Sequence, residues 1–235
     1  MKSWGYWATL GWAVLALFAG QFAALGFVAW WRSAALNSLV LTPYDGVIVA
    51  LLLLISAPIT VAVLALAIRL ARAGFVEYLA LAWPRARYVM PGLAWLVVLI
   101  AAGDALLFLG GRALVTPFQL ESYSTAAAQG WLAVLLFAAI IVAPAVEEIV
   151  FRGFLFRGWV QSDRSAWPAI VVISMLWAAM HVQYDWTGIL QIFIVGLFLG
   201  WTRWRSGSTL LTFILHALFN LEGTIETVVQ MRFFS

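Results

Sequence analysis

The chain has no cysteine and few charged residues, and both shortages restrict what kind of protein it can be. Without cysteine there is no disulfide, no thiolate-bound metal and no cysteine nucleophile. Charged residues make up 10% and hydrophobic residues 65% of the sequence, whereas soluble domains contain about 25% charged residues. A soluble globule needs a polar surface that this composition cannot supply. The sequence therefore predicts a membrane protein.

Lysine is almost absent, because twelve of the thirteen basic residues are arginine. The arginines are spread over the short segments between apolar runs and do not form one basic stripe. The net charge of +3 therefore gives no indication of a nucleic-acid partner.

Long apolar runs follow one another along the chain. A helix needs roughly 20 apolar residues to cross the hydrocarbon layer, and no segment has the alternating pattern of a membrane β-barrel. We therefore predict an all-α, polytopic membrane helix bundle of about seven transmembrane helices, with eight as the alternative, that forms a single integral membrane domain over residues 1–235. The predicted spans are 7–31, 46–68, 89–110, 131–159, 166–183, 187–202 and 208–221.

The placement of basic residues predicts the orientation in the membrane. With seven crossings, the N-terminal side holds ten basic residues and the opposite side three. Cytoplasmic loops are enriched in Lys and Arg, so we predict a multi-pass protein of the cell membrane with a cytoplasmic N-terminus. The ten are Lys2, Arg69, Arg72, Arg85, Arg87, Arg152, Arg157, Arg164, Arg203 and Arg205, and the three are Arg32, Arg112 and Arg232.

Residues 69–88 mix charged residues with Leu, Tyr and Trp. This pattern is typical of an interfacial helix on the cytoplasmic leaflet. A loop whose arginines extend to water explains it equally well.

Two glutamates and an arginine interrupt the fourth apolar run, in the segment EEIVFRG of residues 147–153. A charged group at the bilayer centre costs roughly 2.5–3.5 kcal/mol, so three of them need an explanation. Glu148 and Arg152 are four residues apart and can form an ion pair on one helix face. Glu147 lies about 100° around the helix and has the character of a general base. The alternative is that the span ends early and that all three groups lie in surface water.

The only two histidines, His181 and His216, both fall inside predicted spans. The turn between spans four and five centres near Asp163, so Glu147 and His181 return to nearly the same depth at about 1.5 Å per residue. His216 and Asn220 are four residues apart and share a face of the last span. If these spans touch, the four side chains can meet within the hydrocarbon layer.

Three further acidic residues have no clear partner in the sequence. Asp104 either marks the far end of the third span, the interpretation we favour, or helps to line a cavity. Glu222 and Glu226 share a helix face beyond Asn220, and we predict that they lie in water on the far side.

Three motifs in this region together resemble one known family. The segment 147–153 is similar to the EExxxR motif of the CAAX-protease and bacteriocin-processing family of intramembrane peptidases. The segment WAAMH at 177–181 resembles its FxxxH motif, with Trp177 in place of phenylalanine, and HALFN at 216–220 matches HxxxN. The match covers roughly residues 130–222, which would carry the peptidase-like core.

The resemblance implies roles for these residues. Glu147 and His181 would activate a water molecule that attacks a peptide carbonyl, and His216 and Asn220 would stabilise the oxyanion. Glu148, Arg152 and Trp177 would support them. The implied enzyme is a membrane peptidase whose partners are membrane lipid and a membrane-embedded or lipid-linked peptide or protein substrate, with no nucleic acid.

The residues leave the metal question open. Glu147, His181 and His216 could form a zinc site with one carboxylate and two imidazoles. The chain lacks HExxH, and asparagine is an unusual zinc ligand. The family is often labelled a metalloprotease, but we favour a mechanism without a cofactor and keep zinc as the alternative.

Two other functions fit parts of the sequence. A non-catalytic membrane scaffold or immunity protein could keep the same fold and bind a peptide in the same cavity. A proton-coupled transporter could relay protons through the buried acids and histidines, although no inverted repeat or paired broken helices support it. Neither the substrate nor the oligomeric state follows from the sequence.

Overall fold

The computed structural model describes residues 4–34 and 44–233, and these residues form helices and no strands. Between α5 and α9, one continuous helix runs from Leu132 to Trp159 and contains two π-helical segments, η1 and η2. The elements are α1 (Tyr6–Ala34), α2 (Gly46–Leu70), α3 (Phe75–Tyr78), α4 (Ala86–Leu109), α5 (Pro117–Ala128), α6 (Leu132–Phe137), η1 (Ala138–Val142), α7 (Ala143–Glu148), η2 (Ile149–Leu155), α8 (Phe156–Trp159), α9 (Asp163–Ala179), α10 (Trp186–Ser206) and α11 (Thr209–Phe233).

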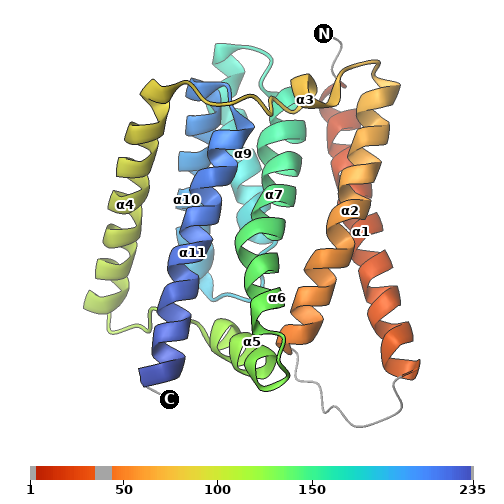
Figure 1. Ribbon diagram of the computed structural model, residues 1–235. Helices are drawn as coiled ribbons and strands as arrows, with labels where there is room; N and C mark the ends of the chain where they lie inside the picture. The colour runs from red at the N-terminus through yellow and green to blue at the C-terminus, as the bar shows by residue number, and fades with distance from the viewer. Residues whose placement is uncertain (1–3, 35–43, 234–235) are drawn as a thin grey trace.

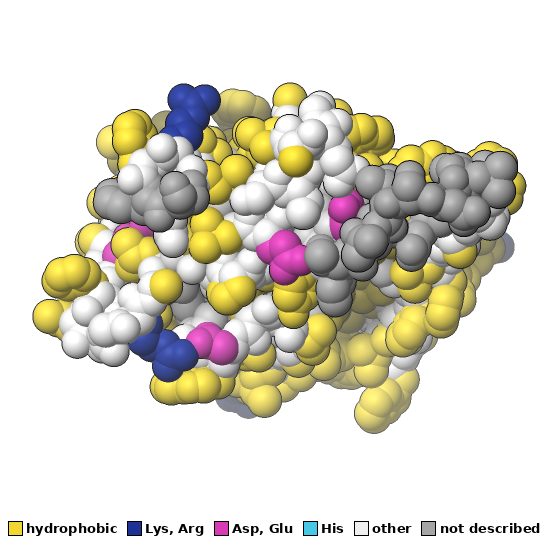
Figure 2. Space-filling model, turned by 90° about the horizontal axis from the view of Figure 1, so that it is seen from below, with side chains coloured by type: hydrophobic (Ala, Val, Ile, Leu, Met, Phe, Trp, Pro, Cys, Tyr) yellow, Lys and Arg dark blue, Asp and Glu magenta, His cyan; other side chains and the backbone are white. Residues whose placement is uncertain are grey.

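The long helices run side by side along one axis of the bundle (Figure 1). Helices α1 and α2 pair at one side, α4 lies at the opposite edge, and the helix containing α7 stands in the middle with α11. Short α5 lies at the end of the bundle away from the N-terminus. Seen from this end (Figure 2), hydrophobic side chains form much of the periphery, and polar atoms with a few charged groups lie between them. The predicted all-α bundle is confirmed.

Within residues 4–34 and 44–233, five helices are long and apolar enough to cross a membrane: α1, α2, α4, the continuous helix of residues 132–159, and α10. The chain is therefore a multi-pass membrane protein. The two other predicted spans correspond to α9, which has 17 residues, and to α11, whose residues include Asn220 and Glu222.

Two predicted spans have wrong boundaries. The fifth ends at Ala179 and not at residue 183. The seventh continues to Phe233 and does not end at residue 221. Arg152 and Arg203 are buried, so they do not count as loop charges in predicting the orientation. Eight basic residues remain on the N-terminal side, against three on the opposite side. Lys2 lies outside the described residues.

Residues 69–88 include one four-residue helix, α3, between the end of α2 and the start of α4, and their four arginines are exposed, as the second interpretation predicted. Part of this segment packs into the bundle. Tyr78 and Leu79 are fully buried, and the Thr209 hydroxyl donates to the Leu79 carbonyl at 2.6 Å. Tyr78 packs on Phe154 with 5.5 Å between ring centroids. A Cβ at Gly153 would lie 2.9 Å from the Leu79 side chain, so glycine at this position allows the close approach. Through these contacts the segment packs between the start of α11 and the helix of residues 132–159.

Two turns set the depth of the site residues. Ser162 caps α9, with its hydroxyl accepting from the Ser165 backbone N–H at 3.3 Å. Gly207 adopts the left-handed conformation, with φ of 71°, between α10 and α11. Both turns lie where the sequence predicted them, near Asp163 and Ser206.

Candidate active site

Glu147 and Glu148 are the last two residues of α7, which lies between the π-helical segments η1 and η2. Each π segment shifts the helical register and changes which side chains face the bundle interior. Such segments often occur at functional sites. The two glutamates therefore lie on a locally irregular part of an otherwise regular membrane helix.

Asn220 of α11 is held against η1. Its Nδ2 donates to the carbonyl oxygen of Ala139 at 2.8 Å. In π-helical register this carbonyl would accept from residue 144, but Pro144 has no N–H. Asn220 therefore satisfies a carbonyl that the proline leaves without a backbone donor, and its amide keeps a second N–H.

Glu148 is the centre of a buried polar network. Its Oε1 accepts from Arg152 Nη1 at 2.9 Å and lies 2.9 Å from His216 Nδ1. The side chains of Glu148 and Arg152 are each 1% exposed, and that of His216 is 3% exposed. Because a carboxylate can only accept, His216 Nδ1 carries the proton, and a neutral ring presents a lone pair at Nε2. The predicted ion pair is confirmed, and it also fixes the orientation of His216.

Arg152 has further partners on two other helices. Its Nη2 donates to the Gly196 carbonyl of α10 at 3.2 Å. Its guanidinium carbon lies 4.4 Å from the ring centroid of Trp177 on α9. These two contacts stabilise the buried guanidinium in addition to its ion pair with Glu148. The early-ending span with Arg152 in water is therefore excluded.

Glu147 faces away from this network, as its position on the helix predicted. Its Oε2 accepts from Trp177 Nε1 at 2.6 Å and lies 3.9 Å from His216 Nε2. Its side chain is 24% exposed. Of the two adjacent carboxylates, Glu148 is therefore enclosed by charged partners, and Glu147 is accessible.

His181 lies in the turn after α9 and not within a helix, which corrects its predicted place inside a span. Its Nδ1 lies 2.9 Å from the Trp177 carbonyl, so this nitrogen is the donor and Nε2 of the neutral ring is the acceptor. Tyr184 stacks on the ring with 6.1 Å between centroids. Burial raises the pKa of the Tyr184 phenol above its ordinary value, so the hydroxyl stays protonated at neutral pH.

Side chains of all three motifs line one cavity of about 260 Å³. They are Glu147, Trp177, His181, His216 and Asn220. The ring of Trp177 contacts both imidazoles edge-on, with centroids 5.4 Å from His181 and 5.1 Å from His216. The two histidines are therefore neighbours around one indole. Their catalytic roles remain predictions.

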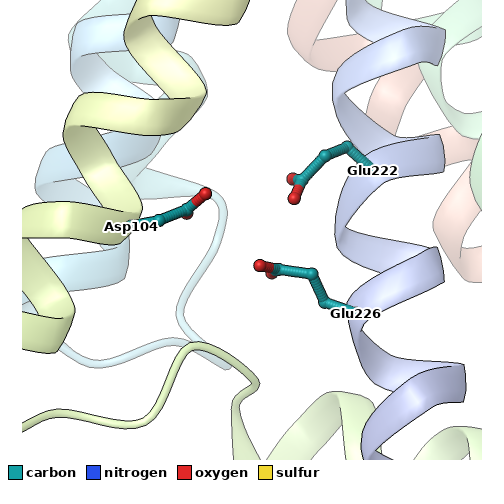
Figure 3. Close-up of side chains that lie close together, drawn as sticks. All are labelled: Asp104, Glu222 and Glu226. Carbon is teal, nitrogen blue, oxygen red and sulfur yellow. The ribbon is translucent and has the colours of Figure 1, made fainter.

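The three further acidic residues also line this cavity. Asp104 of α4 points toward Glu222 and Glu226 of α11 (Figure 3), and carboxylate oxygens of all three lie within 4.8 Å of one another. Asp104 therefore helps to line a cavity, which was the alternative to its favoured place at the far end of the third span. Helix α11 continues past residue 221 and carries Glu222 and Glu226 alongside α4, so both face this cavity.

Removing one of these carboxylates is expected to stabilise the fold. No ion pair among the described residues joins Asp104, Glu222 or Glu226 to a basic group, so the three repel one another when ionised. At pH 8, Glu226→Gln should raise the Tm in detergent by about 2–4 °C, the shift that 1 kcal/mol produces in a domain of this size. The exposed Glu77→Gln is the control and should change nothing. A lower Tm for Glu226→Gln would show that the cluster is held together by a shared proton or a cation.

The suggested zinc ligands do not fit a zinc ion. Zinc holds imidazole and carboxylate ligands at about 2.0–2.2 Å, so their ligand atoms crowd around one point. Within the described residues, the acidic and histidine groups that approach within 4.8 Å of one another are Asp104, Glu222 and Glu226, and not Glu147, His181 and His216. His216 Nδ1 and Glu147 Oε2 are already engaged by Glu148 and Trp177. The arrangement of these three residues therefore gives no support for a metalloprotease mechanism.

Two features of the site were missed in the sequence. The indole N–H of Trp177 binds Glu147, whereas the resemblance implied only an unspecified supporting role for this residue. The signal was available, because tryptophan differs from the motif's phenylalanine by a hydrogen-bond donor. Tyr184 had no such signal, since it contacts His181 only through the turn after α9.

Comparison with known proteins agrees with the motifs. The family described as type II CAAX prenyl endopeptidase Rce1-like matches residues 129–221. The chain is also 33% identical, over 132 residues, to an uncharacterized 24.3 kDa protein of Escherichia coli, and the overlap covers 53% of this chain and 59% of that protein. The chain thus matches less than two thirds of that relative's length. No solved structure matches the chain. The match to the Rce1-like family at residues 129–221 thus falls on the region that carries the three motifs.

Proposed function

We propose that the chain is an intramembrane endopeptidase that hydrolyses a peptide bond of a membrane-embedded or lipid-linked substrate. The observation that carries this proposal is the shared cavity of Glu147, His181, His216 and Asn220 inside a bundle of apolar helices. A non-catalytic scaffold has no need for an accessible carboxylate beside two oriented imidazoles. A proton-coupled transporter could use such groups, but the sequence has no inverted repeat to support one.

Glu147 is the proposed general base. Its carboxylate is accessible from the cavity, while the adjacent Glu148 is neutralised by Arg152. Water held between Glu147 and the Nε2 lone pair of His181 gives its proton to Glu147 as its oxygen bonds to the peptide carbonyl carbon. The hydrogen bond from His181 Nδ1 to the Trp177 carbonyl keeps the Nε2 lone pair available.

His216 and Asn220 are the proposed donors to the oxyanion. The Asn220 amide has two N–H groups. One is bound to the Ala139 carbonyl and fixes the side chain, and the other is available to donate to the oxyanion. His216 Nε2 lies 3.9 Å from Glu147 Oε2 and can donate to the oxyanion when both ring nitrogens carry a proton. Donors fixed in a dry cavity stabilise developing negative charge effectively. Glu147 then returns its proton to the amine as the C–N bond breaks.

We place the protein in the cell membrane with its N-terminus in the cytoplasm, as the remaining bias of eight basic residues against three favours. Helix α5, which contributes to the cavity wall, lies at the end away from the N-terminus (Figure 1). The cavity would then open toward the non-cytoplasmic side. Alkaline phosphatase fused after Ser235 should be active in this orientation, and an inactive fusion with intact expression would reverse it.

Cleavage by purified protein in proteoliposomes tests the proposed activity. The probes are a quenched fluorescent peptide whose farnesylated cysteine is followed by three further residues, with fluorophore and quencher on either side of the cysteine, and the same peptide without the lipid. We expect cleavage of the lipid-linked peptide with mass-identified products and much slower cleavage of the free one. Binding of the peptide without any cleavage would favour the scaffold.

A further inference from the structure

Trp177 occupies the motif position at which phenylalanine is expected, and its indole N–H makes a contact that phenylalanine cannot. Nε1 donates to Glu147 Oε2 at 2.6 Å. We propose that Trp177 is a positioning residue, whose N–H holds the Glu147 carboxylate in the orientation that water activation requires. This inference rests on the proposed peptidase function.

The indole is fixed firmly enough to position another group. Trp177 is 1% exposed. The Arg152 guanidinium lies over one part of the ring at 4.4 Å, and the His216 ring contacts it edge-on. A Cβ at Gly196 would lie 3.1 Å from its Cε3, so α10 closes against it as well. A ring packed by three helices has no second rotamer available, and its N–H points in one direction.

The chemistry of the donor suits this role. An indole N–H can only donate, so it holds Glu147 without competing for the proton that the base must take. It occupies Oε2 and leaves the other carboxylate oxygen for water. The same Oε2 lies 3.9 Å from His216 Nε2, so the contact also sets the distance between the base and the proposed oxyanion donor.

The substitution Trp177→Phe separates positioning from packing, because it keeps an aromatic ring and removes the N–H. A hydrogen bond to a charged group contributes about 1.5–3 kcal/mol, so we expect kcat to fall about 10–100-fold with KM within about twofold of wild type. The matched control is Trp159→Phe, which removes an indole bond to the Tyr6 carbonyl of 3.1 Å. It should leave both constants unchanged. Equal Tm values for the two variants would exclude a general packing defect.

NMR of the indole N–H groups tests the contact without a substrate. In protein labelled with ¹⁵N at its fourteen tryptophans, the indole signal that disappears in Trp177→Phe belongs to Trp177. Glu147→Gln replaces a charged acceptor with a neutral one, so this signal should move upfield while the others stay. A Trp177 signal that does not move in Glu147→Gln would overturn the inference.

The kinetic outcomes separate failure of the inference from failure of the function. If Glu147→Gln abolishes cleavage and Trp177→Phe behaves like Trp159→Phe, the inference fails and the proposed function stands. If wild type cleaves neither peptide, the proposed function fails, and the contact has no catalytic meaning. If Glu147→Gln cleaves as well as wild type, the peptidase function stands, but Glu147 is not the base and the inference fails. A kcat loss confined to Trp177→Phe, with the NMR shift, supports the inference.

Discussion

Glu147→Gln is expected to lower kcat by about 10²–10⁴-fold, the usual contribution of a general base. Glutamine has the same shape and still accepts the Trp177 N–H through its carbonyl oxygen. It cannot take a proton from water. Because the Glu147 side chain is 24% exposed and makes no close ion pair, the free energy of unfolding should stay within about 0.5 kcal/mol of wild type.

The measurement is the rate of cleavage of the lipid-linked peptide together with thermal unfolding of the same samples. Trp159→Phe, which lies outside the cavity, gives the background effect of removing an indole N–H elsewhere in the protein. Full activity of Glu147→Gln would remove Glu147 from the mechanism. An inactive and unfolded Glu147→Gln would show instead that the residue is structural.

Arg152→Met should be the most destabilising of the proposed substitutions, by about 3–5 kcal/mol. The Arg152 and Glu148 side chains are both 1% exposed, so methionine leaves the Glu148 carboxylate in a dry interior with the His216 hydrogen bond and no cationic partner. The change also removes the donor to the Gly196 carbonyl and the cation on the Trp177 ring. Methionine is close to arginine in volume, so loss of charge and not of packing dominates.

Unfolding in denaturant, followed in detergent, measures this effect. The control is the exposed Arg164→Met, which should change stability by less than about 0.5 kcal/mol. Adding Glu148→Gln to Arg152→Met removes the uncompensated carboxylate and should recover part of the loss. A double variant less stable than Arg152→Met alone would mean that the two residues act independently.

Features governed by helical spacing and by membrane chemistry could be predicted from the sequence. The Glu148–Arg152 pair followed from an i,i+4 spacing, and the common depth of Glu147 and His181 followed from the rise per residue and the position of one turn. Apolar runs predicted the helices, because a segment that crosses lipid must make all its backbone hydrogen bonds internally. The motifs gave the family through a resemblance that geometry alone would not have supplied.

Contacts between distant segments could not be predicted in this way. The bond between His216 and Glu148 depends on how α11 packs on α7, and that between Asn220 and Ala139 depends on a π-helical register that no periodicity reveals. The acidic cluster was not predicted because the seventh span was expected to end at residue 221. Helix α11 continues to Phe233, and its Glu222 and Glu226 line the cavity beside Asp104.

Cleavage in H₂¹⁸O tests most directly whether the cavity activates water for peptide hydrolysis. Mass spectrometry of the products formed in a single turnover by wild type should find one ¹⁸O in the new carboxylate, and Glu147→Gln should yield no product above background. Products whose new carboxylate carries only ¹⁶O would contradict direct attack by solvent water, and labelled products from Glu147→Gln at the wild-type rate would contradict Glu147 as the base.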